Sequence, residues 1–73
     1  MIEIPINTEY IRLGALLKLA SIADSGVHAK IMILNEEVTV NGEIEVRRGK
    51  KVREGDVVEL EAYEPFTVKY VEE

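Results

Sequence analysis

Residues 38–46 read VTVNGEIEV, and this stretch decides the fold. Apolar and polar residues alternate on both sides of Asn41-Gly42, as they do in half-buried strands. Asn-Gly readily adopts the positive φ angles of a tight turn. The stretch therefore predicts a β-hairpin.

The register of this hairpin depends on the length of its loop. A two-residue loop places Val40 opposite Glu43, whereas a three-residue loop places Val40 opposite Ile44 and Val38 opposite Val46. We expect the longer loop, because it gathers Val38, Val40, Ile44 and Val46 on one buried face.

Two helices are predicted upstream of the hairpin. The first has one apolar stripe with the spacing i, i+3, i+4 and i+7, made by Leu13, Leu16, Leu17 and Ala20. Ser25 is placed to cap the second helix by accepting a backbone N–H bond. The core face of the second helix consists of Ala29, Met32 and Ile33. A second apolar flank, which is either buried or exposed, consists of Val27, Ile31 and Leu34.

Strands are predicted at both ends of the chain. Residues 2–6 alternate, and Pro5 indicates an edge strand because proline cannot donate to a neighbouring strand. A turn at 54–56 leads into a strand over 57–62, and residues 66–71 alternate again. We predict an α+β fold in a single monomeric domain over residues 1–73, with two short helices packed on a small, mainly antiparallel β-sheet.

The composition bounds the class of protein. The chain has 73 residues, 47% hydrophobic and 32% charged, and no cysteine, so its core must hold it without disulfides. The amino terminus has no basic segment before an apolar run, unlike a signal peptide, and the apolar run 31–34 is too short to span a membrane. We expect a cytoplasmic protein with no membrane partner.

The net charge of -5 conceals one concentrated basic segment. Residues 1–46 hold three basic residues against seven acids, and residues 54–73 hold one against seven. The intervening residues 47–53, RRGKKVR, carry five cations and no acid, and we call them the basic loop. Such a cluster indicates a polyanion partner, although a solvated loop tethered to neighbouring glutamates is the alternative explanation.

The sequence offers little for catalysis. His28 is the only histidine, and only Ser25 is near enough in sequence to form a nucleophile–base pair with it. The spacing of three residues at a helix start favours a cap instead. We therefore expect no catalytic residues, no metal site and no cofactor. The aromatic residues Tyr10, Tyr63, Phe66 and Tyr70 show no stacking platform within the basic loop, so we expect them to serve packing.

Several motifs together resemble a known family, the S-four RNA-binding domain or alpha-L motif. The resemblance covers residues 10 to about 61. It rests on Tyr10-Ile11-Arg12-Leu13, on Ser25 with Ala29-Lys30, on Val38-Thr39-Val40-Asn41-Gly42 and on Gly55-Asp56-Val57-Val58. Glu43-x-Glu45 followed by the basic loop further resembles small stand-alone bacterial members of the family.

The resemblance implies binding to RNA, structured and with ribosomal RNA as a candidate, by the second helix and the adjoining loops. The implied RNA-binding residues are Arg47, Arg48, Lys50, Lys51, Arg53, Lys30, Ser25 and His28. The family commonly has arginine where this chain has Gly26 and glycine where it has Glu36, so more weight falls on the basic loop. Because arginine binds phosphate bidentately, Arg47 and Arg48 should matter most.

Two other classes fit parts of the sequence. Small sulfur-carrier proteins of the ubiquitin-like fold share the Val-x-Val-Asn-Gly element but act through a terminal Gly-Gly, whereas this chain ends Val71-Glu72-Glu73, which disfavours them. A protein-interaction module of a ribonucleoprotein is compatible with RNA binding, and its candidate contact is Val27, Ile31 and Leu34.

Overall fold

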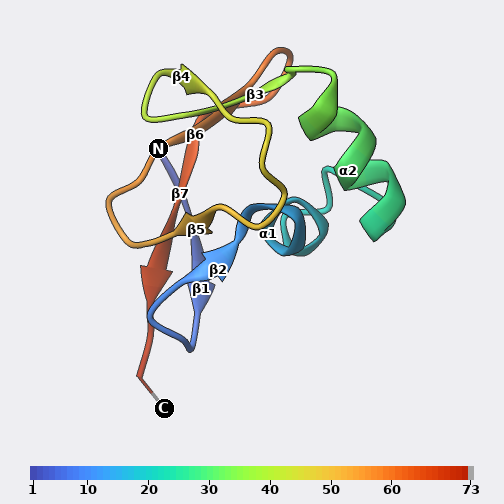
Figure 1. Ribbon diagram of the computed structural model, residues 1–73. Helices are drawn as coiled ribbons and strands as arrows, with labels where there is room; N and C mark the ends of the chain where they lie inside the picture. The colour runs from blue at the N-terminus through green and yellow to red at the C-terminus, as the bar shows by residue number, and fades with distance from the viewer. Residues whose placement is uncertain (73) are drawn as a thin grey trace.

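The computed structural model describes residues 1–72, which form two short helices and seven strands (Figure 1). The helices are α1 (Leu13–Leu19) and α2 (Gly26–Leu34). The strands are β1 (Ile2–Ile6), β2 (Ile11–Arg12), β3 (Val38–Val40), β4 (Glu43–Ile44), β5 (Lys51–Val52), β6 (Val58–Leu60) and β7 (Phe66–Tyr70). The predicted α+β architecture is confirmed.

The strands form one main sheet and one small sheet. The main sheet has the order β1-β7-β6-β3-β4, in which β1 pairs parallel to β7 and the other neighbours are antiparallel. As predicted, β1 lies at an edge, where Pro5 is tolerated. The small sheet pairs β2 with β5, so it joins residues about forty positions apart along the chain.

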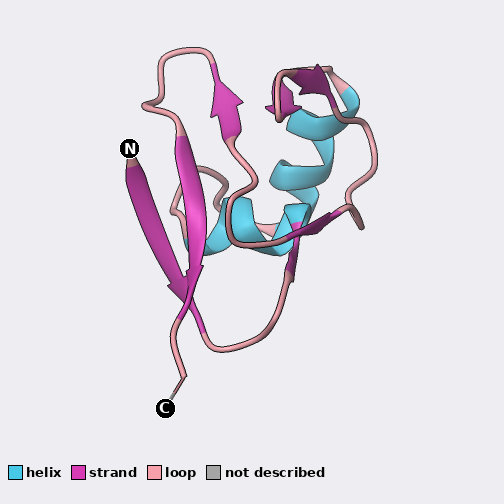
Figure 2. Ribbon diagram, turned by 90° about the vertical axis from the view of Figure 1, so that its left-hand side faces the viewer, coloured by secondary structure: helices cyan, strands magenta, loops and turns pink. Residues whose placement is uncertain are grey.

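The core lies between the helices and the main sheet, and Figure 2 shows both helices lying beside the same sheet. The stripe of α1 is buried as predicted, since Leu13, Leu16 and Leu17 are fully covered. Ser25 caps α2 as predicted, because its Oγ accepts a hydrogen bond from the backbone N–H of His28 at 3.1 Å. Neither helix could cross a membrane, since α2, the longer one, has nine residues.

The predicted hairpin register is wrong. The structure pairs Thr39 with Ile44 and Val40 with Glu43, so the loop has two residues. Val38 and Val40 are buried as expected, but Ile44 and Val46 are 56% and 47% exposed.

The turn itself explains the shorter loop. Asn41 and Gly42 both have positive φ, 54° and 85°, which a two-residue turn requires. The Asn41 side chain accepts a bond from the backbone N–H of Val57 and donates one to Asp56, both at 2.9 Å. Because β4 is an edge strand, the cost of leaving Ile44 in solvent is outweighed by these bonds.

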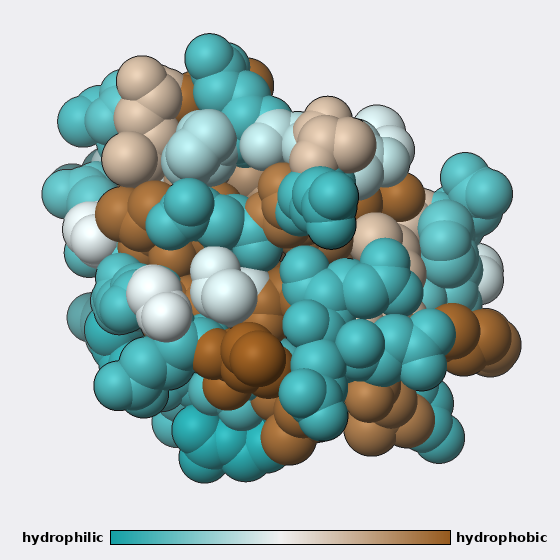
Figure 3. Space-filling view, turned by 90° about the horizontal axis from the view of Figure 1, so that it is seen from above, coloured by the Kyte–Doolittle hydropathy of each residue, from teal (hydrophilic) through white to brown (hydrophobic). Residues whose placement is uncertain are grey.

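The second flank of α2 is exposed, since Val27, Ile31 and Leu34 keep 69%, 51% and 57% of their surface. Seen from above, Figure 3 shows apolar side chains scattered among hydrophilic ones.

Glu36, before β3, has a φ of 61°, which is a left-handed conformation that favours glycine.

Candidate nucleic-acid interface

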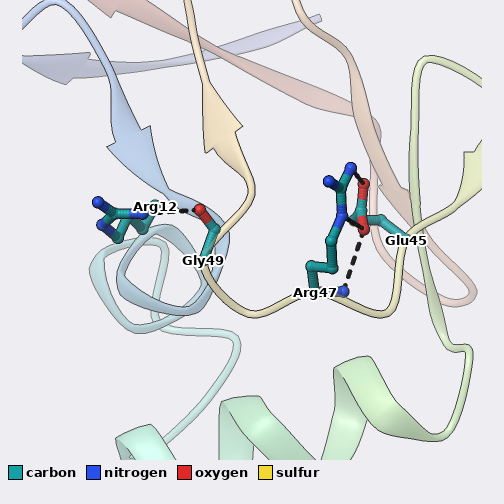
Figure 4. A network of polar contacts seen from close by, with 4 residues as sticks. All are labelled: Arg12, Glu45, Arg47 and Gly49. Atoms are coloured by element: carbon teal, nitrogen blue, oxygen red, sulfur yellow. Dashed lines mark hydrogen bonds and ion pairs between the residues drawn. The ribbon is translucent and has the colours of Figure 1, made fainter.

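The basic loop is held in place by its backbone. The N-cap residue of α1, Arg12, makes no side-chain cap, and carbonyl groups of the loop take over this role. The Leu13 N–H donates to the Lys50 carbonyl at 2.8 Å, and the Gly14 N–H donates to the Arg48 carbonyl at 3.0 Å. The Arg12 guanidinium donates to the Gly49 carbonyl at 2.9 Å (Figure 4). These three bonds fix the middle of the loop through its backbone carbonyls.

Arg48 lies against the start of α1. A Cβ added at Gly14 would stand 2.5 Å from Cγ of Arg48, so this close approach requires glycine. Beyond this contact is a shallow hollow in which the start of α2 meets the basic loop. Its lining residues are Arg12, Gly14, Ala15, Lys18, Gly26, Arg48 and Gly49. Three cations from three parts of the chain thus converge on one concave surface.

A second shallow hollow is lined almost entirely by the basic loop, with Arg47, Gly49, Lys50, Lys51 and Arg53 around it. Among residues 1–72, the side chains of Arg48, Lys50, Lys51 and Arg53 form no ion pair with a carboxylate. Their mutual repulsion is thus left without a direct counter-charge, which favours an anionic ligand.

Arg47 differs from the other cations of the loop. Its Nε and Nη2 donate to the two carboxylate oxygens of Glu45 at 3.0 and 3.1 Å, and its backbone N–H also donates to Glu45 (Figure 4). These bonds lower the pKa of the Glu45 carboxyl and raise that of the Arg47 guanidinium. The alternative explanation, in which the loop is tethered to a neighbouring glutamate, therefore applies to Arg47, because Glu45 partly neutralises its charge.

The far end of the basic loop is anchored by Asp56. Its carboxylate accepts bonds from the backbone N–H of Arg53 and from the Asn41 side chain, both at 2.9 Å. Burial opposes ionisation of Asp56, but these bonds lower the pKa of its carboxyl below the ordinary value. The same carboxylate therefore joins the hairpin turn to the end of the basic loop.

Ser25 and His28 are engaged in capping. The Ser25 hydroxyl accepts from the His28 backbone N–H, and the Asp24 N–H donates to Nδ1 of His28 at 3.1 Å. The imidazole is therefore not bonded to the Ser25 hydroxyl as a general base would be. Lys30 is exposed on α2, four residues after Gly26, but it is not among the residues that line the first hollow.

Four residues of this surface were missed by sequence reasoning. Arg12 and Lys18 were counted only among the three basic residues of the acidic segment 1–46, Gly14 was given no role, and Tyr10 was assigned to packing. The Tyr10 ring instead lies among the cations of Arg12, Lys51 and Arg53. The spacing of Gly14 and Lys18 by four residues could have placed these two on one helix face.

Two helices, a hairpin and a basic loop in this arrangement are what is expected of the class of RNA-binding domain that the sequence resembles, and a family model confirms the resemblance. The family model of the S4 domain matches residues 4–69, so the chain belongs to the S4 domain family and is an S4 RNA-binding domain. It is 49% identical over 65 residues to the probable ribosome maturation protein RlbA of Bacillus subtilis (strain 168). The alignment covers 89% of this chain and 92% of that relative.

Proposed function

We propose that this S4 domain is a non-catalytic protein that binds structured ribosomal RNA through the face formed by the basic loop, the start of α1 and the start of α2. The observation that carries the proposal is the set of four cations, Arg48, Lys50, Lys51 and Arg53, presented without ion-pair partners among residues 1–72 on a loop fixed by its backbone. The name of the Bacillus subtilis relative, a probable ribosome maturation protein, supports ribosomal RNA as the target.

Recognition by this face is directed by shape rather than by base sequence. Lysine and arginine contacts to phosphates position a protein on RNA without reading its bases. Structured RNA presents phosphates at fixed spacings, which a rigid set of cations can match. The proposal includes a cytoplasmic location and a monomer as the active form.

The two arginines that should matter most have different roles in this proposal. Arg48 contributes its charge to the first hollow, where Lys18 and Arg12 also lie. Arg47 must first exchange its contacts with Glu45 for contacts with phosphate. Arg48 therefore contributes more to RNA affinity than Arg47. Ser25 and His28 contribute through the shape of the helix start, and Lys30 contributes through its charge.

The test is the salt dependence of binding to a structured ribosomal RNA fragment. About four phosphate contacts predict that log affinity falls against log salt with a slope of about -3 to -4. Arg48→Ala and Lys50→Ala should each flatten this slope by about one unit, and Arg47→Ala by less.

Lys69→Ala is the matched control, because Lys69 lies on β7 and lines neither hollow. It should leave the slope unchanged. Equal slopes for wild type, Arg48→Ala and Lys50→Ala in folded proteins would contradict the proposed surface, and so would equal affinity for an oligouridylate of the same length.

The exposed strip of α2 supports a second candidate function. Val27, Ile31 and Leu34 keep at least half of their surface on one helix face, and we propose that this strip contacts a protein component of the same ribonucleoprotein. Ile31→Asp should reduce co-sedimentation with the assembled particle but leave the affinity for naked RNA unchanged. An unchanged co-sedimentation would refute this contact.

A further inference from the structure

The outer face of the small sheet gathers residues of one kind. In the β2–β5 pair, Ile11 lies opposite Val52 and Arg12 opposite Lys51. Val52 is fully buried and Ile11 packs against the core, so Arg12 and Lys51 point to the other face. Tyr10 lies two residues before Arg12, and Arg53 lies two residues after Lys51, so both extend this outer face. One aromatic ring and three cations are thereby placed together by the period of two.

The ring of Tyr10 is the common neighbour of these cations. Nζ of Lys51 lies 4.8 Å from the ring centroid, Cζ of Arg53 lies 5.5 Å away, and Cζ of Arg12 lies 5.9 Å away. All three distances are within the range of cation–π attraction, about 6 Å. The negative face of the ring therefore offsets part of the repulsion among three like charges.

The charged groups around the ring are not directly paired with carboxylates. Among residues 1–72, none of the three side chains forms an ion pair with a carboxylate. Arg12 is additionally fixed by its bond to the Gly49 carbonyl, and the backbone N–H of Arg53 is fixed by Asp56. The cluster is therefore anchored by the side chain of Arg12 and the backbone of Arg53, and the ring is the common neighbour of its charged groups.

We propose that Tyr10 is a positioning residue of the RNA site, whose ring holds Lys51, Arg53 and Arg12 as one phosphate-binding cluster on the outer face of the small sheet. The inference rests on the proposed function and adds a specific group of contacts to it. In this proposal the ring acts on RNA through the cations beside it rather than by stacking on a base.

The test compares Tyr10→Phe with Tyr10→Leu. Phenylalanine keeps the ring, and leucine keeps an apolar side chain but removes the π-system, so both variants should fold in this half-buried position. Tyr10→Phe should bind the structured RNA fragment within about twofold of wild type, and Tyr10→Leu about three- to tenfold more weakly. In NMR spectra, the side-chain protons of Lys51 and Arg53 should show ring-current shifts in wild type and Tyr10→Phe that vanish in Tyr10→Leu.

A double-mutant cycle separates positioning from direct contact with RNA. In a Lys51→Ala, Arg53→Ala background, Tyr10→Leu should have almost no further effect, because the ring then has little left to position. A full effect of Tyr10→Leu in that background would mean that the ring contacts RNA itself and would overturn the inference. Unchanged binding by Tyr10→Leu, or equal weakening by Tyr10→Phe, would overturn it as well.

Failure of this inference is distinguishable from failure of the proposed function. If wild type shows no salt-dependent binding to structured RNA, the proposed function fails. The ring-current shifts still report whether Tyr10 holds the cations. If wild type binds and Arg48→Ala weakens binding while Tyr10→Leu does not, the proposed function stands and only the role of Tyr10 is lost.

Discussion

The β3–β4 hairpin and the basic loop follow one another in the chain. A side chain secures the turn of the hairpin, whereas backbone carbonyls secure the basic loop. In the hairpin, the Asn41 side chain bonds to both Asp56 and Val57, in addition to the backbone pairing of β3 with β6. In the basic loop, backbone carbonyls of Arg48 and Lys50 bind the start of α1. A segment fixed by its backbone keeps its side chains available for a ligand, so the hairpin should determine stability and the basic loop affinity.

Asn41→Ala should give the largest effect, and on stability. It removes two hydrogen bonds and places alanine at a φ of 54°, so we expect the free energy of unfolding to fall by about 2–3 kcal/mol in urea titrations. RNA affinity of the folded protein should be almost unchanged. Asn35→Ala is the matched control and should cost less than about 0.5 kcal/mol. Equal losses in both variants would contradict the structural role of Asn41.

Gly14→Ala should give the next largest effect, but on affinity. Alanine favours the helix, yet its Cβ would stand 2.5 Å from Cγ of Arg48, so the Arg48 side chain must move out of the first hollow. We expect RNA to bind about five- to tenfold more weakly in a filter-binding or fluorescence titration, with a melting temperature near that of wild type.

Gly26→Ala provides the control for this change. It makes the same substitution at another glycine of the first hollow, where an added Cβ meets nothing within 4 Å. Its RNA affinity should stay at the wild-type value. If Gly14→Ala and Gly26→Ala bind RNA alike, the packing of Arg48 against α1 does not position its charge.

Features that arise from local spacing could be predicted from the sequence, whereas features that arise from distant contacts could not. Helix stripes, the Ser25 cap and the strands of the main sheet follow from local spacing, and they were predicted correctly, whereas β2 and β5 were not predicted. The hairpin register was missed because burial of one face was given more weight than the local turn preference of Asn41-Gly42, which the bond from Asn41 to Asp56, fifteen residues away, reinforces. The cluster around Tyr10 was missed because it depends on the pairing of β2 with β5, which no local pattern encodes. The concentration of charge in residues 47–53 was visible in the sequence. The sequence did not show which cation of the basic loop would pair with which neighbouring glutamate.

Glu36→Gly should change stability by a smaller amount and in the opposite direction. Glu36 enters the hairpin with a φ of 61°, which costs an L-residue more than glycine. We expect the free energy of unfolding to rise by about 0.5–1 kcal/mol, measured by urea titration, with unchanged RNA affinity. Glu37→Gly, at the next position and without a positive φ, should destabilise instead. A gain in both variants would indicate that the backbone of Glu36 is not strained.

Glu45→Gln should give the smallest effect, and it tests the one cation of the basic loop that is used structurally. Glu45 is mostly covered, with 12% of its side chain exposed, whereas the Arg47 side chain is 71% exposed. Such a pair lies partly in solvent and contributes little to stability, so the variant should remain folded. The freed Arg47 should raise RNA affinity about two- to threefold and steepen the salt slope by up to about one unit.

The pH dependence of stability gives a second measurement on the same pair. Hydrogen bonds from Arg47 lower the folded-state pKa of Glu45 below the unfolded value of about 4.3. The contribution is therefore fully present above that value and is lost as pH falls through the lower folded-state pKa. Between about pH 6 and pH 3 the melting temperature of wild type should fall further than that of Glu45→Gln. Glu43→Gln, on the exposed edge strand β4, should keep both the wild-type acid dependence and the wild-type RNA affinity, because Glu43 forms no ion pair among residues 1–72. If Glu45→Gln matches Glu43→Gln in both measurements, Arg47 is as free in solution as the other cations of the basic loop, and the contrast between the two segments extends to all five of them.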